Sequence, residues 1–332
     1  MGKLSTWINN ARSLALPQSM LPAILAISAS STSDNFNIWL SLIALVGIAF
    51  AHLSMNLMDD YFDYKVNNLE HREIVQRAGM RSRIVKYPYL TDGSATHQQL
   101  GQVVIIFGTI ALLVGAVIFY FRGITVIWPV LAAIILGVEY SGPPFKLGYR
   151  GLGELVIGTI FGPLLMIGMQ ITASSEVTLN MILLSIAAGL LVINILFSHS
   201  VLDLAADQSV GKKTLASVLG KRWLNMSAVV IFNIVPFIII VAGVIFGIFH
   251  PLYLAALVTL PMACYLIWSL SQFTAGRDID LKIKPWMGPM GNWKGICESG
   301  IGWFMIRWLV ARNLVTFFCL VLTIVNIVIA IF

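Results

Sequence analysis

Residues 38–63 read IWLSLIALVGIAFAHLSMNLMDDYFD, an apolar segment that ends in a cluster of acids. The apolar part, residues 38–58, has about the length of twenty residues that a helix needs to span a bilayer. Carboxylates beside a bilayer are costly, so an acidic cluster there indicates a functional site. This stretch therefore predicts a transmembrane helix that ends in a polar site.

The rest of the chain has the same apolar character. It is 58% hydrophobic and 11% charged, which is typical of membrane proteins. Apolar stretches of spanning length occur at 14–32, 38–58, 100–120, 123–139, 151–172, 178–200, 225–249, 250–271 and 313–332. We expect an all-α integral membrane protein in which residues 1–332 form a single polytopic domain with nine transmembrane helices.

The basic residues predict how the chain is oriented. If the N-terminus is cytoplasmic, the inside segments hold every Lys and Arg except Arg122. The positive-inside rule then places the N-terminus inside and the C-terminus outside. This bias, together with attraction to anionic lipid headgroups, explains the net charge of +6, so the charge does not call for a nucleic-acid partner.

The first acidic cluster has helical spacing. Asn56, Asp59, Asp60 and Asp63 stand at i, i+3, i+4 and i+7, so on a helix they project from one face. A divalent cation would relieve the repulsion among these acids, and oxygen-only ligands favour Mg²⁺. A solvated acidic helix end is the alternative interpretation.

A second cluster ends another apolar segment on the same predicted side. Asp203 and Asp207 are four residues apart, and Lys212 and Lys213 follow closely. Lysines bind phosphate oxygens through charge-assisted hydrogen bonds. The alternative is that these lysines only keep this loop on the cytoplasmic side of the membrane. Two acid clusters with nearby bases over an apolar bundle predict a substrate with a diphosphate head and an apolar tail.

Four ordered motifs resemble the UbiA superfamily of intramembrane prenyltransferases, and especially its menaquinone branch. Asp59 to Asp63 is a D-D-x-x-D run of the kind used by isoprenyl diphosphate enzymes, and the resemblance covers roughly residues 8 to 260. The segments that carry it are Ala11–Pro17, Asn56–Tyr61, Tyr140–Leu147 followed by Gly151–Glu154, and Asp203–Asp207 followed by Gly211–Ala216.

The resemblance implies nine transmembrane helices around a central cavity, under a cytoplasmic cap of loops. It implies transfer of a polyprenyl group from its diphosphate to an aromatic acceptor, 1,4-dihydroxy-2-naphthoate, in the inner membrane of a bacterium. The implied Mg²⁺–diphosphate ligands are Asp59, Asp60, Asp63, Asp203 and Asp207. The implied substrate contacts are Arg12, Asn56, Tyr140, Lys146, Lys212 and Lys213.

The chain departs from the family pattern in two places. Asp59 stands where the family usually has Asn, and Asn67 or Asn68 stands near the place of a further acid, with Glu70 the closest carboxylate. The loop expected at 272–312 is also long, and its Trp and Arg content predicts an interfacial amphipathic helix. These departures leave open a non-aromatic acceptor, such as a glycerol ether or sugar phosphate. A cation or lipid transporter is the alternative from another functional class.

Overall fold

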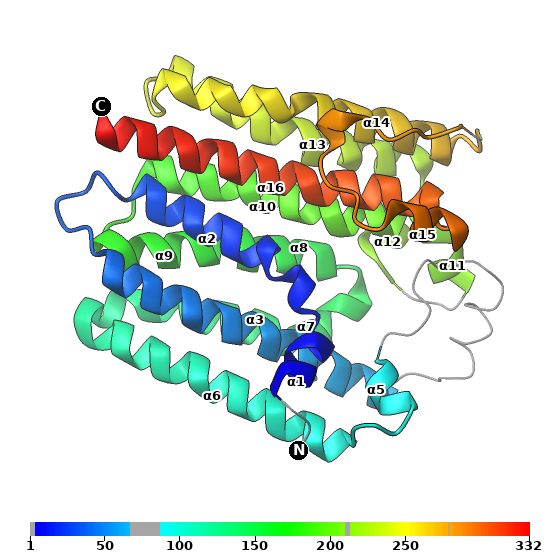
Figure 1. The fold of residues 1–332 in the computed structure, drawn as a ribbon, viewed down its shortest axis with the longest axis horizontal. Helices are drawn as coiled ribbons and strands as arrows, with labels where there is room; N and C mark the ends of the chain where they lie inside the picture. Colours follow the sequence, from blue (N-terminus) through cyan, green and yellow to red (C-terminus); the bar gives the residue numbers. More distant parts are fainter. Residues whose placement is uncertain (1–3, 67–86, 210–212, 278) are drawn as a thin grey trace.

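The computed structural model describes residues 4–66, 87–209, 213–277 and 279–332, and every regular element in these ranges is helical (Figure 1). The longer helices are α2 (Pro17–Ala29), α3 (Ile38–Val66), α6 (His97–Arg122), α7 (Ile127–Ser141), α9 (Leu165–Ser174), α10 (Leu179–Leu202), α13 (Arg222–Ile245), α14 (Leu260–Thr274) and α16 (Gly302–Ile331). The shorter ones are α1 (Leu4–Asn10), α5 (Pro88–Thr91), α8 (Gly153–Thr159), α11 (Leu204–Ser209), α12 (Leu215–Leu219) and α15 (Trp293–Glu298).

Seven helical segments of the described chain are long and apolar enough to cross a membrane. The predicted all-α membrane architecture is thus confirmed, whereas a count of nine spans is not. The difference has two sources. Residues His97–Ser141 form one helical stretch of 45 residues that contains both α6 and α7, and the apolar segment Ser13–Ala29 is shorter than the others. Between α6 and α7 the chain turns at Gly123, whose φ of 69° lies in the region that favours glycine.

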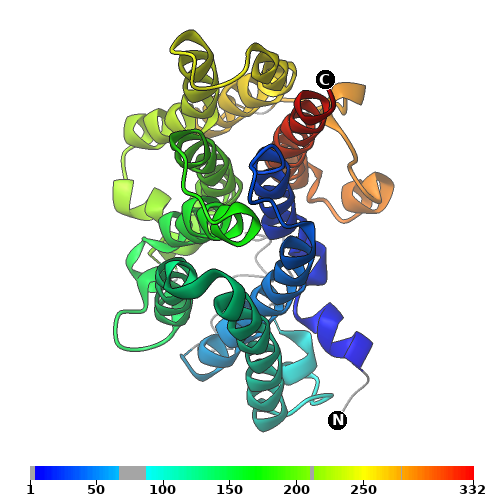
Figure 2. The same ribbon diagram turned by 90° about the vertical axis from the view of Figure 1, so that its left-hand side faces the viewer.

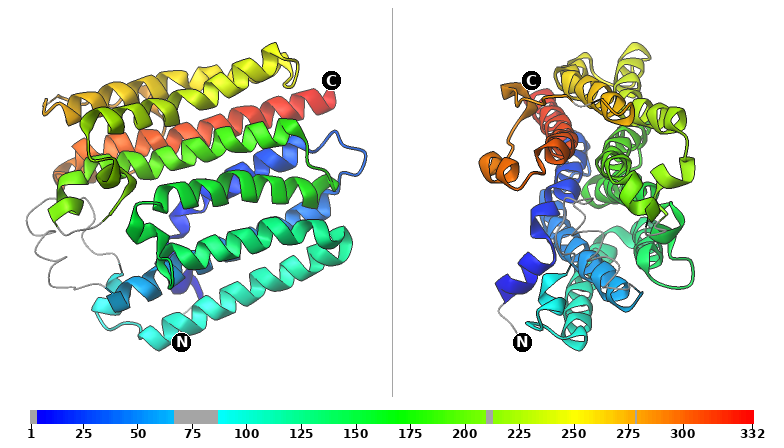
Figure 3. Two further views of the ribbon diagram at one scale, coloured as in Figure 1. Left: turned by 180° about the vertical axis from the view of Figure 1, so that it is seen from behind. Right: turned by 90° about the vertical axis from the view of Figure 1, so that its right-hand side faces the viewer.

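The long helices run side by side, as the end-on view shows (Figure 2), with α13 and α14 at one edge and α6 at the other. α3 packs along α6, α10 along α13, and α16 against both α2 and α10. α2 and α9 each contact α3 as well as α10, so they connect the two helices whose ends carry the acidic clusters. The view from behind shows the same order of helices (Figure 3).

Glycines bring two of these segments into close contact. A Cβ at Gly162 would lie 2.5 Å from Cα of Gly189, and one at Gly158 would lie 2.2 Å from a side-chain atom of Ile193. Residues Ile160–Leu164 between α8 and α9 form a π-helical turn that contains Pro163. Small residues allow the backbones of membrane helices to approach closely, so these glycines fix the position of α8–α9 on α10.

The last helix begins earlier than the sequence indicated. α16 starts at Gly302 and not near 313, so the connection after α14 runs from 275 to 301 and contains α15. The prediction was wrong because Arg307 and Arg312 interrupt the apolar pattern. The buried Arg307 donates through its two terminal nitrogens to the backbone oxygens of Trp303 on the same helix (2.6 Å) and of Ser269 on α14 (3.3 Å).

Candidate active site

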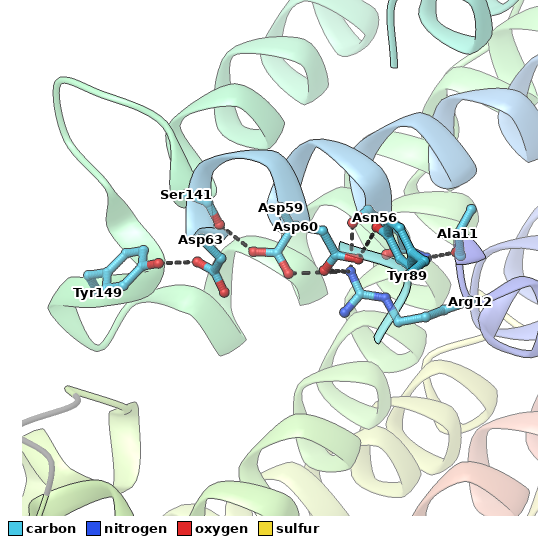
Figure 4. A network of polar contacts seen from close by, with 9 residues as sticks. All are labelled: Ala11, Arg12, Asn56, Asp59, Asp60, Asp63, Tyr89, Ser141 and Tyr149. Atoms are coloured by element: carbon cyan, nitrogen blue, oxygen red, sulfur yellow. Dashed lines mark hydrogen bonds and ion pairs between the residues drawn. The ribbon is translucent and has the colours of Figure 1, made fainter. Parts of the chain in front are cut away.

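The first acidic cluster occupies the last turns of α3. Because α3 extends to Val66, Asp59, Asp60 and Asp63 are held on a helix and not on a loop. Asp60 is fully buried and Asp63 is 4% exposed. Figure 1 shows this end of α3 at the same end of the bundle as α5, α11 and α12, and the acids lie in a row along the helix in Figure 4. The predicted common face of these residues is therefore confirmed.

Arg12 binds this row from the N-terminal segment. Its backbone is left-handed (φ 58°, ψ 47°) between α1 and the following 3₁₀ turn. Its Nη2 donates to the Asn56 backbone oxygen at 2.6 Å, and it lies 3.4 Å from Asp59 Oδ2 and 3.2 Å from Asp60 Oδ1. Burial alone would lower the pKa of Arg12, but the charges of Asp60 and Asp59 outweigh that effect and raise it. Arg12 therefore stays a cation that balances the acids.

Two more groups hold the segment and the acids together. The Asn56 side chain donates to the Ala11 backbone oxygen at 2.9 Å, which ties α3 to the Arg12 segment. The Tyr89 hydroxyl on α5 donates to Asp60 Oδ2 at 2.8 Å. Burial, followed by the charge of Asp60, raises the pKa of Tyr89, so its phenol remains a protonated donor.

The break after α7 brings two further hydroxyl donors to the acids. The helix ends at Ser141, and Gly142, Pro143 and Pro144 follow it, because proline lacks the N–H that a helix needs. The Ser141 hydroxyl before the break donates to Asp59, and the Tyr149 hydroxyl after it donates to Asp63 (Figure 4). Tyr89, Ser141 and Tyr149 were missed by the sequence analysis. Only Ser141 carried a usable signal, because it lies inside the quoted Tyr140–Leu147 motif.

The other residues expected near this break take different positions. Tyr140 is half-buried, and a Cβ at Gly153 would lie 3.2 Å from its ring, so Gly153 packs directly against Tyr140. Lys146 has a left-handed backbone (φ 49°) and is half-buried. Within the described residues Lys146 makes no ion pair with either acidic cluster, so its role as a substrate contact stays a prediction.

The second acidic cluster lies where α10 ends. Asp203 caps α10 and Asp207 lies on α11, so a break in the helix separates the two acids. The Asp207 N–H nevertheless donates to the Asp203 backbone oxygen at 2.8 Å. The two acids are 4% and 1% exposed. Nε2 of His199 lies 3.0 Å from Asp203 Oδ2, whereas Asp203 Oδ1 is enclosed and has no hydrogen-bond partner among the described residues. An enclosed carboxylate oxygen without a donor fits a site for a cation.

Glu154 connects the motifs around this cluster. This last residue of the Gly151–Glu154 motif is a buried carboxylate that accepts from the Ser200 hydroxyl at 2.6 Å and from the Leu215 backbone N–H at 3.1 Å. These bonds join α8 to the end of α10 and to the start of α12. Glu154 therefore fixes the chain on both sides of Asp203 and Asp207.

The donor set of the two clusters is made of carboxylate oxygens, which suits Mg²⁺. In the part of the chain that the structure describes, however, no three His, Cys, Asp or Glu side chains lie close enough to hold a metal ion. Convergence of both clusters on one ion therefore stays a prediction. Of the two lysines that follow the second cluster, Lys213 is exposed and Lys212 lies outside the described residues. Asn67, Asn68 and Glu70, which stand near the place of the family's further acid, also lie outside the described residues.

The arrangement of buried acids at one end of an apolar helical bundle has a counterpart among known proteins. A model of the UbiA prenyltransferase family matches residues 19–286. The chain belongs to the UbiA prenyltransferase family. It is thus an integral membrane protein and a prenyltransferase enzyme, and the match extends further toward the C-terminus than the motifs recognised in the sequence.

Curated relatives include the 2-carboxy-1,4-naphthoquinone phytyltransferase of a Synechocystis species, which is 36% identical over 115 residues, 32% of this chain and 38% of that relative. The 1,4-dihydroxy-2-naphthoate octaprenyltransferase of Mycobacterium tuberculosis is 23% identical over 287 residues, 84% of this chain and 90% of that relative. A UbiA homolog from Archaeoglobus fulgidus, solved with GPP and Mg²⁺, has a TM-score of 0.60 at 14% identity and covers 93% of this chain and 99% of its own. At that identity the structural likeness shows the fold alone.

Proposed function

We propose that this prenyltransferase moves a polyprenyl group from an allylic diphosphate to an aromatic acceptor, 1,4-dihydroxy-2-naphthoate, in menaquinone synthesis. The buried acidic row on α3, bound by Arg12 and Tyr89, is the observation that carries the diphosphate part of the proposal. The acceptor is supported by relatives that bear the name of naphthoate prenyltransferases. The partners would be the prenyl diphosphate, the acceptor and the lipid bilayer.

The residues present fall into metal-binding, diphosphate-binding and positioning groups. Asp59, Asp60, Asp63, Asp203 and Asp207 would hold Mg²⁺, and Arg12, Lys146, Lys212 and Lys213 would bind the diphosphate. A bound Mg²⁺ would neutralise the charge on the leaving diphosphate. Asn56 and Tyr89 would keep Arg12 and Asp60 in place through their hydrogen bonds, and Tyr140 would face the substrate.

The proposed topology has nine spans, with α2 crossing and with α6 and α7 crossing separately. The N-terminus and the acidic ends of α3 and α10 would face the cytoplasm of a bacterial cell, as the distribution of basic residues favours. An ion or lipid pathway would need acids near the bilayer midplane. The acids of this chain instead lie at the last turns of α3 and at the end of α10, which favours an enzyme.

The test of the acceptor uses purified protein in detergent with Mg²⁺, several prenyl diphosphates and two acceptors, 1,4-dihydroxy-2-naphthoate and a prenylated glycerol phosphate. We expect mass spectrometry to find a prenylated naphthoate product with release of diphosphate. Product from the glycerol phosphate alone would move the enzyme to a non-aromatic acceptor, and absence of product with both would refute the proposal.

The test of the acids compares Asp60→Ala and Asp203→Ala with Asp280→Ala, whose carboxylate side chain is 78% exposed. We expect the first two variants to lose prenyl transfer by about 100-fold or more, as removal of electrostatic stabilisation at a leaving group does. The Asp280 variant should keep wild-type activity. A folded Asp60 or Asp203 variant with near wild-type rate in Mg²⁺ would contradict the metal assignment.

A further inference from the structure

His52 lies on the same helix as the acids, on the side of Asn56 away from them. It precedes Asn56 by four residues and Asp59 by seven, which at about 1.5 Å per residue places it roughly 10 Å further along α3. The residue is 4% exposed. A histidine that is buried in an apolar helix, about one helical turn before Asn56, requires a physical explanation.

The ring of His52 is held on two sides. Its Nδ1 lies 2.6 Å from the Ser19 hydroxyl on α2, and its ring lies 4.8 Å from that of Phe161 in the π-helical turn. The Ser19 hydroxyl has one proton and also lies 3.1 Å from the Leu16 backbone oxygen, which can only accept. The tautomer with the ring proton on Nδ1 uses both contacts at once, because the ring then donates to Ser19 while Ser19 donates to Leu16. We assign this tautomer, in which Nε2 is an unprotonated acceptor.

Nε2 makes no hydrogen bond with any described residue. It is also not among the enclosed side-chain atoms that lack a partner, so it borders on space that a ligand atom can reach. π-helical turns inside α-helices occur frequently at functional sites, and here such a turn carries the ring that packs on His52. A fixed imidazole whose second nitrogen is used by no described residue has the geometry of a general base.

We propose that His52 is a catalytic residue that binds the hydroxyl of the aromatic acceptor through Nε2 and removes its proton during prenyl transfer. The inference rests on the proposed function and names the group that meets the acceptor. Its position fits, because a diphosphate bound at the acids would direct its allylic carbon along α3 toward the apolar part of the bundle. An electron-rich hydroxylated ring would thus lie between His52 and the acids.

The step balances in atoms and charge. The bond between the allylic carbon and the diphosphate oxygen breaks, and its electron pair leaves with the diphosphate. A ring carbon bonds to the allylic carbon while the hydroxyl proton moves to Nε2, which leaves a ketone on the ring. The alkylated carbon then loses its proton, or its carboxyl group as carbon dioxide, and the ketone oxygen regains the proton from Nε2. The imidazole ends as it began.

Two variants separate the base from its support. In His52→Gln the amide oxygen can accept a hydrogen bond near the place of Nε2 but cannot take a proton. We expect kcat for prenyl transfer to fall about 100-fold, with the acceptor KM within about threefold of wild type. In His52→Asn the amide can still donate to Ser19, so this variant keeps the hydrogen bond that holds α3 to α2. It should lose kcat to the same extent, because the base is absent. Ser19→Ala keeps the imidazole and should lose only roughly fivefold.

Binding of geranyl diphosphate with Mg²⁺ is the control that distinguishes loss of a base from general damage to the site. If His52 were only structural, its replacement would weaken this binding as well. Both His52 variants should bind it as wild type does, because the change lies away from the acids. Wild-type kcat in either folded variant would overturn the inference while the proposed function stands, and so would an equal loss of geranyl diphosphate binding. A wild-type enzyme that prenylates no aromatic acceptor would overturn the proposed function, and this inference with it.

Discussion

The Tyr89→Phe variant isolates one hydrogen bond to the acidic row. The Tyr89 hydroxyl donates to Asp60 Oδ2 at 2.8 Å, and its ring packs edge-on against Trp7 with centroids 5.9 Å apart. Phenylalanine keeps the ring contact and removes only the donor. A hydrogen bond to a charged group contributes about 1.5–3 kcal/mol, and each 1.4 kcal/mol corresponds to about tenfold. We therefore expect kcat/KM for prenyl transfer to fall about 10- to 100-fold.

The assay is the initial rate of product formation, with thermal unfolding in detergent as the check on folding. Tyr120→Phe is the matched control, because that side chain is 83% exposed on α6 and should tolerate the change at no cost. A Tyr89→Phe enzyme that unfolds like wild type and retains its rate within about twofold would refute the role of this bond in holding Asp60.

The pH dependence of the same variant gives a second check. The pKa of Tyr89 is raised by burial and by the charge of Asp60 above the value of about 10 that the unfolded chain would show. The bond therefore contributes fully at every pH below about 10 and is lost only as the pH rises through the folded-state pKa. The ratio of wild-type to variant activity should be constant between about pH 6 and 9. A ratio that falls to one within that range would contradict a protonated Tyr89.

Two further predictions concern helix packing. Gly162→Ala places a Cβ 2.5 Å from Cα of Gly189, and we expect it to destabilise the fold by about 1–3 kcal/mol, seen as a lower unfolding temperature. Gly115→Ala, where a Cβ meets nothing within 4 Å, should leave that temperature unchanged or higher. Asn233→Leu removes a reciprocal pair with Asn194 (3.0 and 2.8 Å) between α10 and α13, and should cost about 1–2 kcal/mol in the same assay. Equal unfolding temperatures of the two glycine variants, or an unaltered Asn233→Leu protein, would contradict these assignments.

The sequence predicted those features that depend on periodicity along the chain. The apolar stretches coincide with helices, and the i, i+3, i+4, i+7 spacing of the first acids is a true helix face because α3 continues beyond them. Each of these depends on a few neighbouring residues, and local backbone geometry is what spacing reports.

Contacts between distant segments could not be predicted in this way. Arg12 reaches Asp59 because its own backbone is left-handed, a conformation that no apolar pattern encodes. Tyr149 reaches Asp63 only after the chain has turned back at the Pro-Pro break. The sequence placed the start of the last helix too late for a similar reason. Arg307 is accommodated inside α16 by the backbone oxygen of Ser269, which lies on another helix and cannot be inferred from the apolar pattern.

The bonds of Arg12 relate the structure to the proposed chemistry. Its Nη2 carries two protons but lies near three acceptors, the Asn56 backbone oxygen at 2.6 Å, Asp60 at 3.2 Å and Asp59 at 3.4 Å. Its Nε, in contrast, is enclosed and has no hydrogen-bond partner in the part of the chain that the structure describes. A guanidinium fork that leaves one donor unused is incompletely satisfied by two carboxylates. A diphosphate offers further acceptor oxygens with the spacing that the fork requires, so the same residue that balances the acids is equipped to bind the substrate they would hold.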